Sequence, residues 1–233
     1  MDSRRKKLWR LALGAMTVQA VGAAYHLVVR PRMLVWGMTQ EEARQPLPGD
    51  DLEPDPVVNT THAVTIDAPP SAIWPWIVQV GYGRAGWYTH EWVERLLFAG
   101  KYAEGHSATR IHPELQDLRV GDHIYRARGA KWPVLALEPE RLLIIAGQAF
   151  VLQDLGDRRT RLIVRTRGPG YVRALFVKLP VLRQLGAIID YVVGEPLHHY
   201  MEKGMVLGIA ERAEGRPGST SVARTPQPEA AAV

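Results

Sequence analysis

A stretch of 19 residues without a formal charge, from Leu11 to Val29, constrains this chain more than any other feature of its sequence. As a helix it would be about 28 Å long, close to the ~30 Å thickness of the hydrocarbon core of a bilayer. Trp9 and Tyr25 lie near its ends, where amphipathic rings prefer the membrane interface. The pattern predicts a membrane helix, with residues 8–29 in contact with lipid.

Three interpretations of this segment stay open. We favour an uncleaved signal anchor over a signal peptide that is cleaved near the small residues of "VGAA", and over a helix that lies on the membrane or packs on the body. Five basic residues between positions 4 and 10 precede the stretch, and Arg30 and Arg32 follow it. The positive-inside rule predicts a single-pass membrane protein with its N-terminus in the cytoplasm and its body outside.

The positive charge of the chain belongs to this N-terminal segment. The net charge is +5 for all 233 residues and +6 for residues 1–32, which leaves −1 for the remainder. A nucleic-acid-binding domain carries its positive charge on the folded body. No nucleic-acid partner is therefore expected.

Composition and the positions of the prolines divide the chain into four parts. Residues 1–32 are the anchor, and residues 33–60 form a spacer in which Pro46, Pro48, Pro54 and Pro56 forbid a long helix. The spacer either wraps the domain or holds it away from the membrane. Residues 61–214 have the apolar content of a single globular domain, whereas residues 215–233 are too polar to bury a core and are expected to be disordered.

The order of elements in the body predicts an α+β fold. A β-branched strand at 61–67 precedes two short helices, at 70–80 and 90–100, and then come five apolar strand segments separated by turns at Pro139 and Gly156. The strand at 160–167 alternates, so one face is expected to meet the core and the other, with Arg161, Ile163, Arg165 and Arg167, to meet water. A helix beginning at Pro196 and ending at Glu214 follows, and it is expected to lie across a curved antiparallel sheet.

The glycines of "IVQVGYGRAGWYTHEW" pose the main functional question. Gly81, Gly83 and Gly86 have the G-x-G-x-x-G spacing of a dinucleotide-binding turn, but that turn needs a strand before it and a βαβ unit around it. Here the preceding segment follows a double proline and is expected to be a helix that Gly81 caps. The alternative is a glycine bend that frames an aromatic pocket, because six Trp and Tyr side chains fall between positions 74 and 92.

Three segments of the body resemble the SRPBCC superfamily of START-related, helix-grip proteins, often described as polyketide cyclase/dehydrase-like. They are "APPSAIWPWIVQVGYGRAGWYTHEW", "PELQDLRVGD" and "HHYMEKGMVLGIAERAE", and "WGMTQEEARQPLPGD" resembles the lead-in of a membrane-tethered branch of that family. The resemblance covers residues 33–214. It implies a deep apolar cavity between a curved antiparallel sheet and the C-terminal helix, which in this family binds lipids, hormones or polyketides and in a minority of members supports cyclisation or dehydration.

The sequence offers little to a nucleophilic or metal-dependent mechanism. The chain has no cysteine and no G-x-S-x-G or H-E-x-x-H motif, and Ser71 stands where a helix cap is expected. His198 and His199 are neighbours on a helix and point about 100° apart, so they do not easily share an ion. No metal and no cofactor are expected.

Candidate site residues are those expected to line a pocket or to titrate inside it. The weak acid–base candidates are His90, Glu91, Asp122 and Glu202, each of which is also explained as a solvated surface charge. Arg84 is the preferred polar contact for a carboxylate or phosphate head group. The expected ligand-binding residues are Trp87, Tyr88, Arg84, Tyr82, Trp92, Tyr125, Tyr200, Met201, Gly204 and Met205. For Trp87 and Tyr88, packing in the core is an equal alternative to lining a pocket. For the residues of the last helix, tight packing onto the sheet is an equal alternative.

These observations lead to three hypotheses of function. The leading one is a membrane-anchored helix-grip domain that binds a hydrophobic small molecule or lipid without catalysis, driven by apolar burial. The second is a cyclase or dehydratase that uses acid–base chemistry in the same cavity. The third is a membrane-surface interaction module in which the Arg161–Arg167 face and the apolar region 171–193 contact lipid head groups or a partner.

Overall fold

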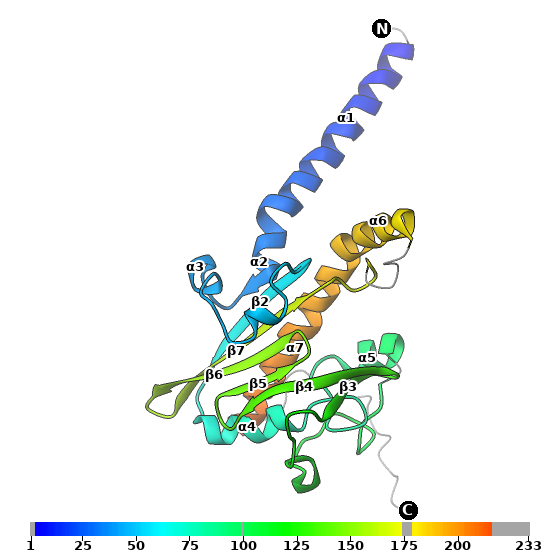
Figure 1. The fold of residues 1–233 in the computed structure, drawn as a ribbon. Helices are drawn as coiled ribbons and strands as arrows, with labels where there is room; N and C mark the ends of the chain where they lie inside the picture. The colour runs from blue at the N-terminus through cyan, green and yellow to red at the C-terminus, as the bar shows by residue number, and fades with distance from the viewer. Residues whose placement is uncertain (1–2, 99, 174–178, 216–233) are drawn as a thin grey trace, which may run out of the picture. The chain divides into compact units, whose positions relative to one another are not determined.

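A computed structural model of the chain describes residues 3–98, 100–173 and 179–215 (Figure 1). The chain divides into two compact units. Unit 1 comprises Met1–Ala63, Gly147–Ala149 and Ile163–Tyr200. Unit 2 comprises Val64–Ala146, Phe150–Leu162 and Met201–Val233.

The fold is α+β, as predicted. In the described residues a mostly antiparallel, open sheet of seven strands has the order β1-β2-β7-β6-β5-β4-β3, and a long C-terminal helix, α7, ends the described chain. This combination is consistent with the predicted helix-grip fold. The strands are β1 (Val35–Trp36), β2 (Val58–Ile66), β3 (His123–Ala127), β4 (Ala130–Glu138), β5 (Leu142–Ile145), β6 (Gln148–Gly156) and β7 (Arg159–Gly168).

The helices follow the expected order, with two short ones after β2 and the long one last. They are α1 (Ser3–Ala24), the π-helical turn η1 (Tyr25–Val29), α2 (Arg30–Leu34), α3 (Gln40–Ala43), the 3-10 turn η2 (Asp50–Leu52), α4 (Pro70–Val78), α5 (Glu91–Phe98), the 3-10 turn η3 (Pro113–Leu115), α6 (Pro180–Ile189), the π-helical turn η5 (Asp190–Gly194) and α7 (Glu195–Ala213). The tail predicted to be disordered lies outside the described residues from position 216 onward.

The strand meander turns where the sequence predicts. Pro139 lies between β4 and β5, and Asp157 and Arg158 join β6 to β7 with φ angles of 50° and 56°. Positive φ at both central residues is the geometry of a type I′ hairpin turn, whose twist matches that of the flanking strands.

Two prolines are accommodated by π-helical turns. Pro31 follows η1 and Pro196 follows η5, and in both places the chain remains helical through the proline. A proline inside a helix lacks an N–H and crowds the preceding turn, and a wider π turn relieves both conflicts. The predicted start of the last helix at Pro196 agrees with α7 to within one residue, and α6 and η5 precede α7 without a break in the helical stretch.

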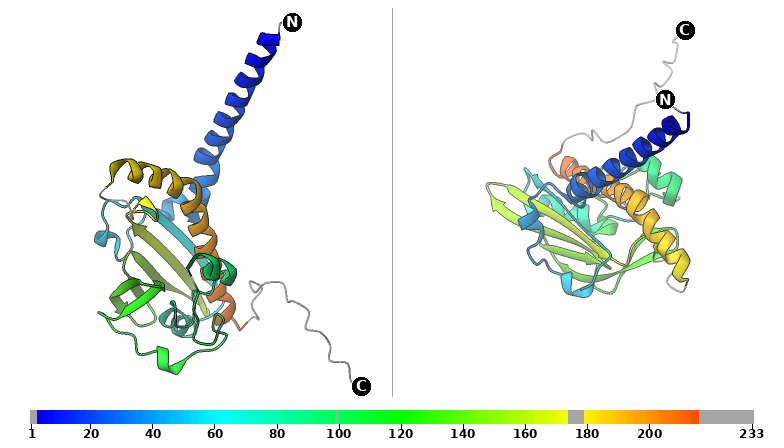
Figure 2. Two further views of the ribbon diagram at one scale, coloured as in Figure 1. Left: turned by 90° about the vertical axis from the view of Figure 1, so that its right-hand side faces the viewer. Right: turned by 90° about the horizontal axis from the view of Figure 1, so that it is seen from above.

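The N-terminal helix carries the span predicted from the sequence. The helical stretch Trp9–Leu34 has a mean hydropathy of 1.4 in its most apolar part, which is entirely unburied, and it is long and apolar enough to cross a membrane. Figure 2 shows α1 as one straight ribbon in both views. Among the described residues no other helix meets the same measure of length and hydropathy.

The core of unit 2 is aliphatic. Its fully buried side chains come from helices α4 and α7 and from strands β2, β3, β5, β6 and β7. Those with at most 1 % exposure include Ile66, Ile73, Ile77, Ile124, Leu143, Ile145, Phe150, Leu162 and Ile209. All four residues of β5 are buried, so both faces of this strand are covered.

Three local predictions were wrong. Ser71 is not the cap of α4, because the helix begins at Pro70 and Pro69 occupies the cap position without a side-chain bond. Gly81 does not cap α4 either, since that helix ends at Val78 and Gln79 follows as its C-cap. The second face of β7 does not meet water, because Ile163 and Arg165 are only 4 % and 3 % exposed.

The proline- and acid-rich segment explains the burial of Arg165. Within unit 1 the Arg165 guanidinium donates to the carbonyl oxygens of Ala43 and Gln45, and it contacts the Asp50 carboxylate at 2.6 Å. Arg167 donates to the carbonyl of Glu53 at 3.0 Å. The segment therefore follows the surface of unit 1 over residues 43–53.

Candidate functional site

The glycine bend of unit 2 has no free backbone donor for a phosphate. Gly81, Gly83 and Gly86 have φ angles of 126°, 74° and 82°, and a bridge joins Gly81 to Gly86. Every N–H from residue 81 to residue 86 donates to a backbone carbonyl, with acceptors in Gly86, Tyr125, Lys101, Gly81, Gln79 and Gly81 in turn. A phosphate-binding turn points several unpaired N–H groups at its ligand, so the bend is not a nucleotide site.

Arg84 is held by the end of the helix before it. Its guanidinium donates to the carbonyl oxygens of Val78, Val80 and Leu115 at 3.0–3.1 Å. Val78 and Val80 lie at the C-terminal end of α4, where carbonyls lack helical partners and favour a cation. Burial lowers the pKa of Arg84. The structure thus gives Arg84 a capping role, and its role in orienting a ligand stays a prediction.

Tyr88 is a core residue of unit 2 with a polar tip. It is 1 % exposed, and its hydroxyl oxygen accepts a hydrogen bond from the Gln79 side chain at 2.8 Å. The Arg212 guanidinium lies 4.6 Å from the centre of its ring. Burial, more than any other cause, raises the pKa of Tyr88. Tyr88 therefore connects the glycine bend to α7.

Glycines of α7 let that helix approach the same segment closely. A Cβ at Gly208 would lie 2.1 Å from the Tyr88 carbonyl oxygen, and one at Gly204 would lie 2.5 Å from the Thr89 hydroxyl. The Thr89 hydroxyl also donates to the Met201 carbonyl at 2.7 Å. Of the two alternatives for these glycines, room for a ligand or close backbone approach, the geometry supports the second.

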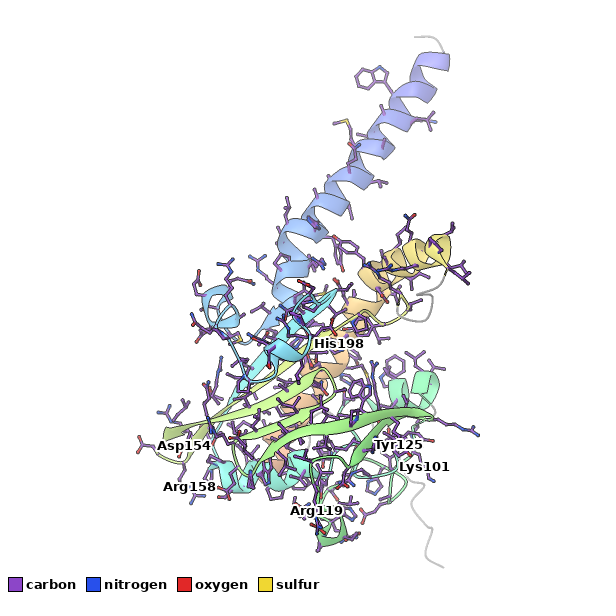
Figure 3. The ribbon with its side chains drawn as sticks, in the orientation of Figure 1. Lys101, Arg119, Tyr125, Asp154, Arg158 and His198 are labelled. Atoms are coloured by element: carbon purple, nitrogen blue, oxygen red, sulfur yellow. The ribbon has the colours of Figure 1, made fainter. Side chains whose placement is uncertain are left out.

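Half-exposed indoles form the other side of the bend. The Trp87 and Trp132 rings meet edge to face with centroids 6.3 Å apart, and the Trp87 Nε1–H donates to the Arg126 carbonyl at 3.2 Å. The Arg126 guanidinium lies 5.1 Å from the centre of the Trp132 ring. Tyr82 is half-buried, and its N–H donates to the Tyr125 carbonyl. Figure 3 labels Tyr125, whose side chain is 42 % exposed.

Helix α5 buries one charged side chain and exposes most of its large apolar ones, although Val93 is buried. Its apolar residues Trp92, Leu96 and Leu97 are 56 %, 72 % and 51 % exposed, whereas Glu94 is 5 % exposed. The apolar positions that identify this helix in the sequence are therefore mostly not its buried positions. Exposing such side chains to water raises the free energy of the protein, and covering them with an apolar partner lowers it.

The buried Glu94 is a residue that sequence reasoning missed. Its carboxylate accepts a hydrogen bond from the Tyr102 hydroxyl, and among the described residues its Oε1 atom has no partner. Burial is the largest cause of the raised pKa of Glu94. A nearby acid, Glu91, accepts from the Ser107 N–H at 2.7 Å. No sequence signal marks Glu94, because an acid in an amphipathic helix ordinarily faces water.

Replacing Glu94 with glutamine is expected to increase the free energy of unfolding at neutral pH and to flatten its pH dependence. Because the folded-state pKa lies above the unfolded one, the folded protein binds more protons between the two values, and stability falls as pH rises through that window. Glutamine carries no charge to desolvate, and its side-chain oxygen can still accept a hydrogen bond from the Tyr102 hydroxyl. Urea unfolding of the full chain between about pH 4 and 8 measures the effect.

The exposed pair Glu138 and Arg141 supplies the control for this experiment. Replacing Glu138 with glutamine should leave the pH profile close to that of the wild type, because exposed ion pairs contribute little. A Glu94→Gln variant that is less stable than the wild type at neutral pH would contradict the assignment.

The acid–base candidates come from three segments of unit 2. His90 and Glu91 stand at the start of α5, with the His90 carbonyl accepting from the N–H groups of Val93 and Glu94. Asp122 is exposed and accepts from the Arg119 N–H in the turn before β3. Glu202 is 3 % exposed on α7. Their catalytic roles stay predictions.

The remaining predicted contacts lie on α7. Met201 is half-buried and Met205 is 3 % exposed, both in unit 2, while Tyr200 in unit 1 is 43 % exposed. In unit 1, the rings of His198 and His199 lie 6.4 Å and 5.1 Å from the His62 ring, centroid to centroid. The His198 Nε2 atom lies 3.1 Å from the Thr60 hydroxyl, and the His199 Nδ1 atom lies 2.9 Å from the His62 Nε2 atom. Within the described part of the chain no three His, Asp or Glu side chains form a group that could hold a metal ion.

Comparison with known proteins gives structural resemblance only. No protein-family model matches the chain, and no curated protein matches it. Among solved structures, a protein from Arthrobacter aurescens is 12 % identical, with a TM-score of 0.36 over 72 % of this chain and 92 % of its own. Protein CV1439 from Chromobacterium violaceum is 13 % identical, with a TM-score of 0.27 over 57 % and 93 % of the two chains. CalU16 from Micromonospora echinospora is 17 % identical, with a TM-score of 0.24 over 67 % and 84 %.

Proposed function

We propose that this chain is a membrane-anchored helix-grip protein, related to the SRPBCC superfamily, that binds a hydrophobic small molecule or lipid in an internal cavity. The apolar helix Trp9–Leu34 would hold it in the membrane as a single-pass protein. The basic residues before that helix would keep the N-terminus in the cytoplasm and the body outside.

The observation that carries the proposal is the exposed apolar side of α5, which would form the entrance to the cavity. Trp92, Leu96 and Leu97 are presented outward from a helix whose Glu94 is buried. Leaving three large apolar side chains in water is unfavourable by roughly 25 cal/mol for each Å² of apolar surface. An apolar ligand that covers them recovers this free energy, and the half-exposed Trp87 and Trp132 indoles would extend the same contact.

Binding is preferred to catalysis because the polar groups near the bend already have structural partners. Arg84 is occupied by three carbonyls, Glu91 by the Ser107 N–H and Asp122 by the Arg119 N–H. A cyclase or dehydratase would need one such group beside its substrate, within hydrogen-bond reach of the proton it transfers. That alternative predicts loss of turnover with unchanged ligand affinity in His90→Ala.

Replacing Trp92 with alanine is expected to reduce the amount of apolar ligand retained by the purified protein about tenfold, the effect of ~1.4 kcal/mol in binding. Trp92 is exposed, so its loss should leave folding intact. Native mass spectrometry of the full chain, released from nanodiscs, measures the bound molecule. Trp87→Ala should act in the same direction.

The control is Leu155→Ala, which removes an apolar side chain on β6 that is 46 % exposed and outside α5. It should retain ligand as the wild type does. The proposal fails if the wild type carries no apolar molecule, or if Trp92→Ala and Trp87→Ala retain as much as Leu155→Ala.

A further inference from the structure

A second exposed apolar surface lies in unit 1, on α6 and the π turn that follows it. Val181, Leu185, Ile188 and Val192 recur at helical spacing and are 79 %, 53 %, 61 % and 60 % exposed. Flanking them on the same side, and also exposed, are Leu182, Ile189 and Val193. We call these seven residues the α6 surface. A continuous outward apolar face of this kind marks an interaction site.

The opposite side of the same helix fixes its orientation. The buried Asp190 carboxylate accepts hydrogen bonds from the N–H groups of Tyr171, Val172 and Arg173 at 2.7–3.1 Å. Gly186 packs so closely that a Cβ there would lie 3.0 Å from the Arg173 Cα atom. Because the inner side is bonded to the chain in this way, the helix cannot turn its apolar side inward without breaking these contacts.

The base of the N-terminal helix is attached to the end of the α6 surface. The Tyr25 hydroxyl donates to the Tyr191 carbonyl at 2.8 Å, and the His26 Nδ1 atom lies 2.7 Å from the Tyr191 hydroxyl. The Arg30 guanidinium makes a two-point ion pair with Glu195 at 2.6 and 2.7 Å. All of these residues belong to unit 1. The α6 surface is therefore held beside residues 25–30, where the uncharged stretch Leu11–Val29 ends.

A basic hollow borders the α6 surface. Arg173, Pro180, Arg183, Gln184 and Ala187 line a partly open space of about 350 Å³. Among the described residues neither Arg173 nor Arg183 has an ion-pair partner. Arginine recognises phosphate through parallel N–H groups, and basic side chains beside an apolar face favour an anionic lipid surface.

We propose that the α6 surface is an interfacial docking site for an anionic phospholipid bilayer, with the lipid phosphates taken by Arg173 and Arg183. This rests on the membrane anchoring in the proposed function and not on the internal cavity. The partner is a bilayer and not a protein because a membrane helix attached at Tyr191 brings the lipid surface to this site without a second binding event. One spanning helix leaves the body free to rotate about the membrane normal and to tilt, and a second contact would fix its orientation toward the lipid.

The absence of cysteine from the chain allows the test to be made on the full protein. Single cysteines at Leu185 and Ile188 are labelled with an environment-sensitive dye, and the protein is placed in phosphatidylcholine nanodiscs with and without phosphatidylglycerol. A cysteine at Val18, within the span, is the lipid reference. A cysteine at Arg158, in the polar β6–β7 turn labelled in Figure 3, is the water reference.

The expected result is quenching of the Leu185 and Ile188 labels by lipid-borne nitroxide several-fold above that of Arg158, and further increased by phosphatidylglycerol. Arg183→Glu should abolish the phosphatidylglycerol increment and leave the Val18 signal unchanged. Adding salt should reduce the increment in the wild type.

The proposal is overturned if the α6 labels match the Arg158 reference while Val18 is quenched, since the anchor then holds and the surface does not dock. It is also overturned if Val18 itself is not quenched, because the anchor on which it rests is then absent. Protection of the α6 labels only in native membranes that contain other proteins would favour a protein partner instead. Loss of ligand in the mass-spectrometric experiment bears on the cavity alone.

Discussion

Replacing Gly208 with alanine is expected to destabilise the protein by about 3 kcal/mol or more, the upper range for overpacking a core. The added Cβ would lie 2.1 Å from the Tyr88 carbonyl oxygen and 3.0 Å from the Tyr88 Cβ. Both are attached to the backbone of a buried residue, so no rotation of a side chain relieves the conflict. Either α7 or the segment at Tyr88 must move, which disturbs the bond from Gln79 to the Tyr88 hydroxyl.

Thermal unfolding of the full chain, followed by circular dichroism, measures this effect, at roughly 2–4 °C for each kcal/mol in a protein of this size. Gly204→Ala is the matched comparison on the same helix. The added Cβ at position 204 would meet the Thr89 hydroxyl and the His90 ring, which are side-chain atoms that can shift. The decrease in unfolding temperature should therefore be smaller than for Gly208→Ala. Gly14→Ala meets no atom within 4 Å and should be neutral or slightly stabilising. Equal unfolding temperatures for Gly208→Ala and Gly14→Ala would contradict the close approach.

The element order was predictable because each element carries a local signal. The double proline before α4, the alternating strands and the turns at Pro139 and Gly156 act over a few residues, and the structure agrees with them. Predictions that needed distant partners succeeded less often. The second face of β7 was expected to meet water, yet Arg165 is buried by its bonds to Ala43, Gln45 and Asp50, more than a hundred residues earlier in the chain.

The candidate site illustrates the same limit. The sequence identifies Gly204 and Gly208 as unusual in a helix, but only the distance to Thr89 and Tyr88 shows why glycine is needed there. Likewise the hydrophobic pattern that identifies α5 does not reveal that Trp92 is exposed and Glu94 buried. Periodicity assumes that apolar residues face inward, and Trp92, Leu96 and Leu97 of α5 depart from that assumption.

The loss of Arg165 is expected to be the other large effect, about 3–5 kcal/mol, as for a buried ion pair that loses one partner. Its guanidinium is 3 % exposed in unit 1 and donates to the Asp50 carboxylate, to two carbonyls of the acid-rich segment and to the Thr61 hydroxyl. In Arg165→Leu these acceptors lose their donor and segment 43–53 loses its main attachment to β7. Urea unfolding measures the stability, and trypsin cleavage after Arg44 measures the detachment.

A lysine at position 165 should restore only part of the stability, because one ammonium group cannot direct N–H groups at acceptors on several sides as a planar guanidinium does. Arg159→Ala, on the same strand but exposed, should change stability by less than ~0.5 kcal/mol. A free energy of unfolding that rises from Arg165→Leu to Arg165→Lys to the wild type is expected only if Arg165 acts through directed hydrogen bonds. If Lys and Leu were equally unstable while trypsin cut neither variant faster than the wild type, the guanidinium would not be what holds the segment to β7.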